Sequence, residues 1–117
     1  NGIVYATDAT ILDREQLREI TLNDDVLMRD ILTALIDDTG RQMALLEAAI
    51  RNQNVQQCMR LAHYSKGACV NVGALAAAAA LKDIERKAST GEFDECTSSL
   101  AALSQELDRL RAETAAL

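Results

Sequence analysis

Proline is absent from this sequence of 117 residues, and glycine occurs only five times. Few positions therefore interrupt a helix or require backbone that only glycine adopts easily. The residues that dominate instead, among them alanine, leucine and glutamate, lose little conformational freedom in a helix. The composition predicts an all-helical protein.

Aromatic residues are also scarce, at 3% of the chain, and the formal net charge is −6. Stacking of nucleobases needs aromatic platforms, and binding to a phosphate backbone or an anionic lipid surface needs a basic patch. We therefore expect no nucleic-acid partner and no direct membrane contact.

Long hydrophobic runs are missing as well. The longest, over residues 74–81, is far shorter than the roughly 20 residues of a membrane-spanning helix. The first residues also lack the pattern of a secretory signal peptide. The sequence therefore predicts a cytoplasmic protein, or the cytoplasmic part of a larger one.

Cysteine occurs three times, at Cys58, Cys69 and Cys96, and no two lie at the spacing of a zinc or redox motif. Three widely separated thiols are typical of small buried side chains in a reducing compartment. A metal or haem site that joins His63 to Cys58 or Cys69 is a weaker alternative, because a helical wheel places the cysteines and the histidine on different sides.

Apolar spacing and capping residues indicate five helical segments. After an irregular lead-in over residues 1–11, a short helix begins at Asp13, and four longer helices cover about residues 24–51, 55–70, 74–88 and 92 onward. Short connections force neighbouring helices to run in opposite directions. We predict one all-α domain over residues 1–117, an antiparallel up-and-down four-helix bundle with a short extra N-terminal helix.

The residues predict four further details of these helices. Asp13, followed by Gln16, is typical of a capping box, and Asn23 is the predicted N-cap of the second helix. That helix should continue through Gly40, because its apolar stripe stays in register beyond it. The last helix carries a heptad seam, assigned to the bundle core of a monomer. The seam comprises Phe93, Cys96, Leu100, Leu103, Leu107, Leu110, Thr114 and Leu117.

The only histidine, His63, falls within the third helix. At about 100° per residue, His63 lies at the edge of the core-facing sector of that helix, so its ring should be partly exposed. The sector itself comprises Val55, Cys58, Ala62, Ser65 and Cys69.

Lys66 and Gly67 follow His63 by three and four residues and therefore share its surface on a helix. If the ring accepts a phosphoryl group, Lys66 can stabilise the added negative charge, with Arg60 as a weaker candidate. Gly67 destabilises the helix but removes a side chain beside the ring, so that another protein can approach closely. On this spacing alone, an ordinary histidine at the edge of a core is the more common explanation.

The longer segment Ala62-His63-Tyr64-Ser65-Lys66-Gly67-Ala68, followed by Gly73-Ala74, resembles the signature of histidine-containing phosphotransfer (Hpt) domains. Farther along, Ile84-Glu85 resembles a hydrophobic-glutamate pair of the family's next helix. The resemblance covers about residues 13–117 and implies a four-helix bundle with an N-terminal helix. It also implies a phosphoryl carrier that has no ATP-dependent kinase activity of its own.

By this resemblance, His63 would take a phosphoryl group from the aspartate of one response-regulator receiver domain and pass it to another. The domain itself would bind no cofactor, since magnesium would belong to the receiver's acidic pocket. The chain would stand alone or form part of a hybrid sensor histidine kinase. Contacts with the receiver are expected around His63, at Gln56, Met59, Arg60, Tyr64 and Val70.

The sequence departs from the family pattern at Ser65, where leucine is usual. Its hydroxyl should face the core and bond to the carbonyl of Leu61. The phenylalanine common in the middle of the long helix is also missing, with Ile36 or nearby aliphatic residues in its place. A different class of function stays open, namely a non-catalytic helical interaction or scaffold module without phosphotransfer.

Overall fold

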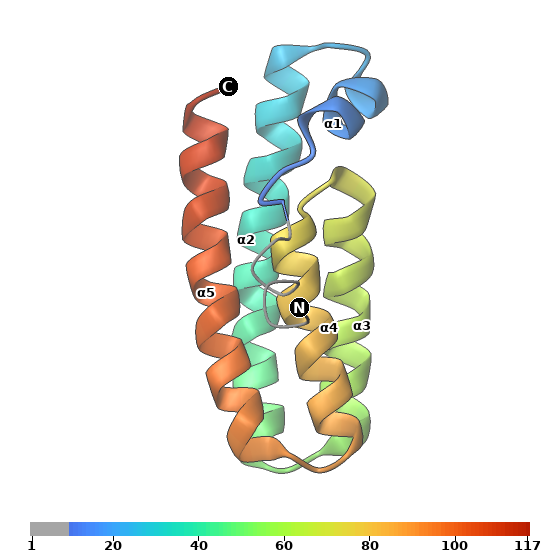
Figure 1. Ribbon diagram of the computed structural model, residues 1–117, viewed down its shortest axis with the longest axis vertical. Coiled ribbons are helices and arrows are strands. Elements are labelled where there is room, and N and C mark those ends of the chain that lie inside the picture. Colours follow the sequence, from blue (N-terminus) through green and yellow to red (C-terminus); the bar gives the residue numbers. More distant parts are fainter. Residues whose placement is uncertain (1–9) are drawn as a thin grey trace, which may run out of the picture.

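Five α-helices make up the computed structural model, which describes residues 10–117 (Figure 1). The helices α2 to α5 run alternately up and down as a bundle, and α1 lies at the end where α2 begins and α3 ends. No strand occurs within the described residues. The predicted all-α bundle with a short N-terminal helix is therefore confirmed. The bounds are α1 (Arg14–Thr21), α2 (Asp25–Arg51), α3 (Val55–Val72), α4 (Leu75–Ser89) and α5 (Phe93–Ala115).

The predicted boundaries hold to within about two residues. Most of the predicted irregular lead-in over residues 1–11 lies outside the described residues, although Thr10 and Ile11 are not helical. The prediction for Asn23 is wrong. The N-cap of α2 is Asp24, whose Oδ1 accepts the amide of Leu27 at 3.0 Å. Asparagine and aspartate cap helices about equally well, so two adjacent candidates could not be separated by residue type.

Three hydrogen bonds join the start of α1 to the end of α3. Asp13 caps α1 as predicted, and its backbone amide also donates to the carbonyl of Gly73 at 2.8 Å. The Gln16 side chain does not close a capping box. Its Nε2 instead donates to the carbonyls of Val70 at 2.8 Å and Asn71 at 3.1 Å. These bonds satisfy carbonyls that the end of α3 leaves without helical partners.

The core lies between α2, α3, α4 and α5, and α2 continues through Gly40 as predicted. The predicted heptad seam of α5 faces this core, with Cys96, Leu103, Leu107 and Leu110 buried. One predicted core position is wrong. Val55 is 36% exposed, because it is the first residue of α3 and lies at the end of the bundle.

Ser65 faces the core as predicted and is 1% exposed. The expected bond to the carbonyl of Leu61 is absent, and the Ser65 hydroxyl has no hydrogen-bond partner among the residues that the structure describes. An unpaired buried hydroxyl destabilises a core. Ser65 is therefore a weak point inside α3.

The three cysteines are free and fully buried, as predicted. Burial raises the pKa of the Cys69 thiol to about 11, against an opposing hydrogen bond with Thr39. Within residues 10–117, no group of three His, Cys, Asp or Glu side chains is placed to hold a metal ion. Because the cysteines are buried while His63 is exposed, the alternative of a metal or haem site is not supported. None of the described helices has the length and apolar character to span a membrane.

Candidate functional site

His63 lies in the middle of α3 and points outward. Its side chain is 71% exposed, more than the partial exposure that the helical wheel predicted. The ring nitrogen Nδ1 lies 3.2 Å from Oε2 of Glu85 on the neighbouring helix α4. The other ring nitrogen, Nε2, has no hydrogen-bond partner among the described residues.

Glu85 also binds Lys66. The Nζ atom of Lys66 donates to Glu85 Oε1 at 2.8 Å. Each oxygen of the Glu85 carboxylate therefore bonds to a different predicted site residue, Oε1 to Lys66 and Oε2 to His63. The Lys66 and Glu85 side chains are 26% and 21% exposed, whereas the histidine is mostly in solvent. The ion pair is thus sheltered between α3 and α4, with the ring at its outer edge.

The charge of Glu85 decides which ring nitrogen carries the proton. Burial acts to raise the pKa of Glu85, but the hydrogen bond and charge of Lys66, together with His63, outweigh it and hold this pKa below its ordinary value. An ionised carboxylate can only accept hydrogen bonds, so Nδ1 of His63 must be the donor. In a neutral imidazole, the lone pair is then on Nε2, the ring nitrogen that Glu85 does not bind.

Gly67 is exposed, one turn beyond His63. A Cβ atom added there would meet nothing within 4 Å among the described residues. Gly73 differs, because it caps α3 with φ 87 and an added Cβ would lie 2.9 Å from the Asp13 carbonyl oxygen. The fold therefore requires glycine at position 73 but not at position 67, where glycine costs about 0.5–1 kcal/mol of helix stability.

The five residues predicted to contact a receiver all lie on α3 with His63. Four of them, Gln56, Arg60, Tyr64 and Val70, are exposed, and Met59 is partly buried against the core.

Two of these side chains are already engaged within the chain. The Arg60 guanidinium is hydrogen-bonded to the Gln57 side chain. Arg60 would have to leave this partner before it could bind a phosphoryl group as a second cation. The Tyr64 hydroxyl donates to Oδ2 of Asp38 in α2 at 3.4 Å.

Glu85 is the site residue that sequence reasoning missed. The pair Ile84-Glu85 is part of the resemblance to the family, but the sequence pattern assigns Glu85 no role in the site. Glu85 is 22 residues from His63 and 19 from Lys66, so no local spacing connects it to them. The helices α3 and α4 lie side by side (Figure 1), and only this packing brings the Glu85 carboxylate to the ring.

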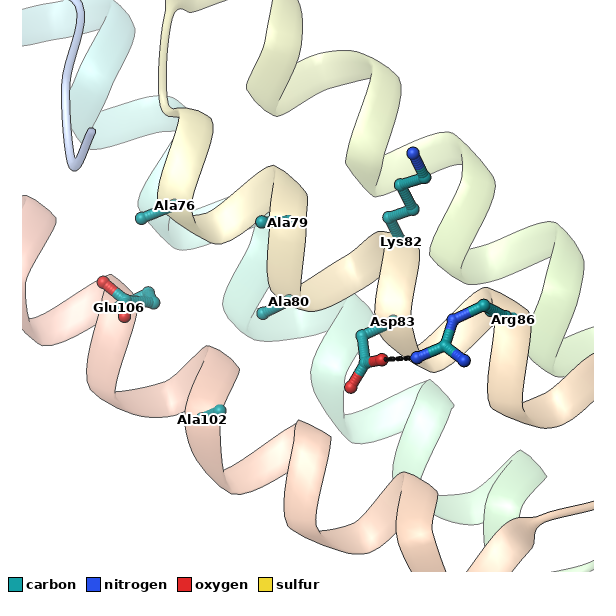
Figure 2. Close-up of a pocket in the computed structure, with 8 residues that line it drawn as sticks. All are labelled: Ala76, Ala79, Ala80, Lys82, Asp83, Arg86, Ala102 and Glu106. Atoms are coloured by element: carbon teal, nitrogen blue, oxygen red, sulfur yellow. Dashed lines mark hydrogen bonds and ion pairs between the residues drawn. The ribbon is translucent and has the colours of Figure 1, made fainter. Parts of the chain in front are cut away.

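A groove of about 430 Å³ lies elsewhere, between α4 and α5 (Figure 2). Its floor is formed by alanines, and its charged rim includes Asp83, which pairs with Arg86. The groove contains no histidine and lies beside α5, whereas Glu85 faces α3. It is therefore not part of the site around His63. The lining residues are Ala76, Ala79, Ala80, Lys82, Asp83, Arg86, Ala102 and Glu106.

A family model described as the Hpt domain matches residues 30–113, most of the chain. The chain belongs to the Hpt domain family. The matched range includes the whole site, from His63 to Glu85. Among proteins of curated function, no sequence matches significantly.

Two solved structures resemble this Hpt domain. Histidine-containing phosphotransfer protein B (HptB) from Pseudomonas aeruginosa matches with a TM-score of 0.80 and 23% identity, over 89% of this chain and 90% of that one. A rice protein provisionally described as a histidine-containing phosphotransfer protein matches with a TM-score of 0.79 and 18% identity, over 98% and 83% of the two chains. At these identities the likeness shows the fold.

Family membership carries the function. Hpt domains are phosphoryl carriers, and this Hpt domain acts in histidine phosphotransfer within a phosphorelay, as the sequence predicted. The alternative of a scaffold without phosphotransfer loses its support, because the chain keeps both the family's sequence pattern and its fold.

Proposed function

We propose that His63 is the phosphoacceptor of this Hpt domain, taking a phosphoryl group from the aspartyl phosphate of one response-regulator receiver domain and handing it to another. One observation carries this assignment. The only histidine of the chain is exposed on α3, and Glu85 binds its Nδ1, while Nε2 has no hydrogen-bond partner among the described residues. A nucleophilic nitrogen must have a free lone pair and be reachable by another protein's active site, and Nε2 meets both conditions.

The transfer step follows from this geometry. The Nε2 lone pair attacks phosphorus, and the bond from phosphorus to the aspartate oxygen breaks, so that the aspartate leaves as a carboxylate. The ring keeps its proton on Nδ1 and becomes a phosphorylated imidazolium, whose positive charge faces Glu85. The reverse step, onto a second receiver, uses the same atoms.

Lys66 stabilises the phosphoryl group in this proposal. Its ammonium is one helical turn from His63 and lies on the same carboxylate as the ring, so it is close to the group that Nε2 receives. An ammonium has three N–H donors, of which Glu85 needs one. The remaining donors can bond to phosphoryl oxygens, which carry most of the new negative charge.

Gly67 provides steric access in the same proposal, since nothing within the described residues of the chain explains the absence of a side chain there. The receiver would then dock over α3. Its contacts would include Gln56, Met59, Arg60, Tyr64 and Val70, which surround His63 on this helix.

The remaining features of the proposal concern the setting of the domain. It acts as a monomer in the cytoplasm and has neither ATP-dependent kinase activity nor a cofactor of its own. The magnesium ion that receiver chemistry uses belongs to the receiver's acidic pocket. The domain stands alone or belongs to a hybrid sensor histidine kinase.

Phosphotransfer from a ³²P-labelled receiver domain tests the assignment. The wild-type protein should acquire an acid-labile phosphate that mass spectrometry places on His63. A His63→Gln variant should remain unlabelled while its circular dichroism spectrum and melting temperature match those of the wild type. Continued labelling of this variant would disprove the assignment, and binding of a receiver without any labelling would instead favour a scaffold.

A further inference from the structure

Charge is distributed unevenly over the helices of this protein. The chain has a formal net charge of −6, yet α3 carries two basic residues, Arg60 and Lys66, and no acidic one. Of the five described helices, only α3 and α4 have more basic than acidic residues. On α5, by contrast, five acidic residues face two basic ones in number. The helix that holds His63 and its neighbour α4 are therefore the basic part of an acidic protein.

Lys82 extends this basic character onto α4. Its side chain is exposed and forms no ion pair within residues 10–117. Lys82 precedes Glu85 by three residues, so the two share one side of α4, the side that meets α3. Figure 2 shows the Lys82 side chain directed away from Ala102 and Glu106 of α5. Lys82 is therefore a cation beside the site, although the sequence pattern assigned it no role.

Arg60 lies on the other side of His63. It precedes the histidine by one helical turn, and its guanidinium is bonded to the uncharged Gln57 side chain. Because α3 and α4 are antiparallel, a residue that precedes Glu85 in α4 lies alongside residues that follow His63 in α3 (Figure 1). Two cations without an acidic partner among the described residues, Arg60 and Lys82, therefore flank the histidine from opposite ends.

The acidic groups near the site do not offset these two cations. Glu85 pairs with Lys66 at 2.8 Å. Asp38 of α2, which accepts a hydrogen bond from the Tyr64 hydroxyl, pairs with Arg41 at 3.5 Å. Each of these carboxylates already has a cation of its own. The surface around the histidine should therefore have a positive potential over roughly 10 Å, the Debye length at 0.1 M salt.

We propose that Arg60, Lys66 and Lys82 form a basic surface that attracts the acidic face of a receiver domain around its phosphorylated aspartate. This inference rests on the function proposed for His63. A receiver presents carboxylates and a phosphoryl group where it must meet Nε2, so opposite charges approach each other as the reacting atoms do. The attraction acts before contact, so Arg60 need not leave Gln57. Its effect is on the rate of association, and the transfer step itself belongs to His63 and Lys66.

Ionic strength separates this surface from the charge of the whole protein. If the net charge of −6 governed the encounter with an acidic receiver, salt would weaken a repulsion and speed association. If the basic surface governs the encounter, salt should slow association.

Stopped-flow fluorescence anisotropy measures the association rate constant. The probe is a labelled receiver domain that carries beryllium trifluoride in place of the phosphoryl group, so that it binds without transfer. The rate constant should fall by about tenfold between about 20 and 500 mM sodium chloride. A rate constant that stays level or rises with salt would overturn the inference.

Two variants assign the effect to the basic surface. Lys82→Gln and Arg111→Gln each remove one positive charge from an exposed side chain, but Arg111 belongs to α5 and pairs with Asp108. At low salt, Lys82→Gln should lower the association rate constant about threefold and Lys82→Glu about tenfold. Arg111→Gln should bind at the wild-type rate. Equal rates for the wild type and Lys82→Glu, or equal losses in Lys82→Gln and Arg111→Gln, would refute the role of Lys82.

Transfer kinetics show whether Lys82 acts on association alone. In rapid-quench experiments with a phosphorylated receiver, Lys82→Gln should reduce the rate about threefold when the receiver is well below saturation. With saturating receiver, the transfer rate should equal that of the wild type. A loss that persists at saturation would place Lys82 in the chemical step and contradict the proposed role.

The two proposals can fail separately. If receivers bind with the expected dependence on salt and on Lys82 but none labels the protein, the function proposed for His63 fails and the basic surface stands. If receivers label His63 at rates that neither salt nor Lys82→Glu lowers, the function stands and the basic surface has no part in it.

Discussion

The helix α4 presents two carboxylates to two neighbours, Glu85 to α3 and Asp83 to α5. Both are partly buried, both bind a lysine, and the pKa of each lies below its ordinary value. Burial acts to raise the pKa of Asp83, but hydrogen bonds from Ser99, Lys87 and Arg86 and the charge of Lys87 outweigh it. The difference is in the side chain that each carboxylate binds besides its lysine or arginine partners, which is an exposed histidine for Glu85 and a buried serine for Asp83.

This difference distinguishes a structural network around Asp83 from a network around Glu85 that includes predicted site residues. Around Asp83 the groups satisfy one another, since the Ser99 hydroxyl donates to Asp83 at 2.6 Å and accepts from Lys87 at 2.8 Å (Asp83 also appears in Figure 2). Around Glu85, Nε2 of His63 has no hydrogen-bond partner among the described residues, and the histidine side chain is 71% exposed. The network around Asp83 is therefore closed and joins α4 to α5, whereas the network around Glu85 is open at an exposed histidine.

The largest expected effect is on the open network. Lys66→Ala should slow transfer from a phosphorylated receiver by about 10- to 100-fold, because a hydrogen bond to a charged group contributes about 1.5–3 kcal/mol. Its melting temperature should stay near that of the wild type. Rapid-quench kinetics measure the rate. An unchanged rate would show that Lys66 takes no part in the transfer and that its role, like that of Lys87, is structural.

The closed network should respond in stability instead. Ser99 is 4% exposed and bonded to both Asp83 and Lys87, so Ser99→Ala should lower the free energy of unfolding by about 1–2 kcal/mol. Urea denaturation measures this loss. Phosphotransfer by the folded variant should equal that of the wild type, and a slowed transfer would show that the two networks are coupled through α4.

Two mid-helix glycines sharpen the comparison further. Gly67 and Gly40 are both exposed, with nothing within 4 Å of an added Cβ among the described residues. Either change to alanine should stabilise the protein by about 0.5–1 kcal/mol in urea denaturation. Gly40 belongs to α2, distant in sequence from the α3 site. Only Gly67→Ala should slow phosphotransfer, by about tenfold, and equal transfer by both variants would show that Gly67 is not needed for access.

The smallest effect is expected at Ser65, the counterpart of Ser99. Both serines are buried, at 1% and 4% exposure, but the Ser65 hydroxyl has no partner among the described residues. Ser65→Ala should therefore be neutral or stabilise the fold by up to about 1 kcal/mol. Thermal and urea unfolding compare it with Ser99→Ala. A loss as large as that of Ser99→Ala would mean that the Ser65 hydroxyl is satisfied after all.

Much of this architecture could be predicted from local pattern. The apolar stripe that continues past Gly40 predicted one long α2, and the seam from Cys96 to Leu110 predicted the buried face of α5, because helical periodicity depends only on neighbouring residues. The choice between Asn23 and Asp24 as N-cap failed for the same reason. Both residues fit the local requirement, and the turn geometry between α1 and α2 decides between them.

The sequence by itself determined that this protein is helical, that His63, Lys66 and Gly67 share one face of α3, and that the chain resembles the family to which it belongs. These properties depend on residue types and on separations of a few positions. Only the tertiary structure decided that Glu85 bonds to His63 and Lys66 and that Gln16 joins α1 to α3. These contacts join residues 19 to 55 positions apart, and no local periodicity specifies which faces of two helices meet.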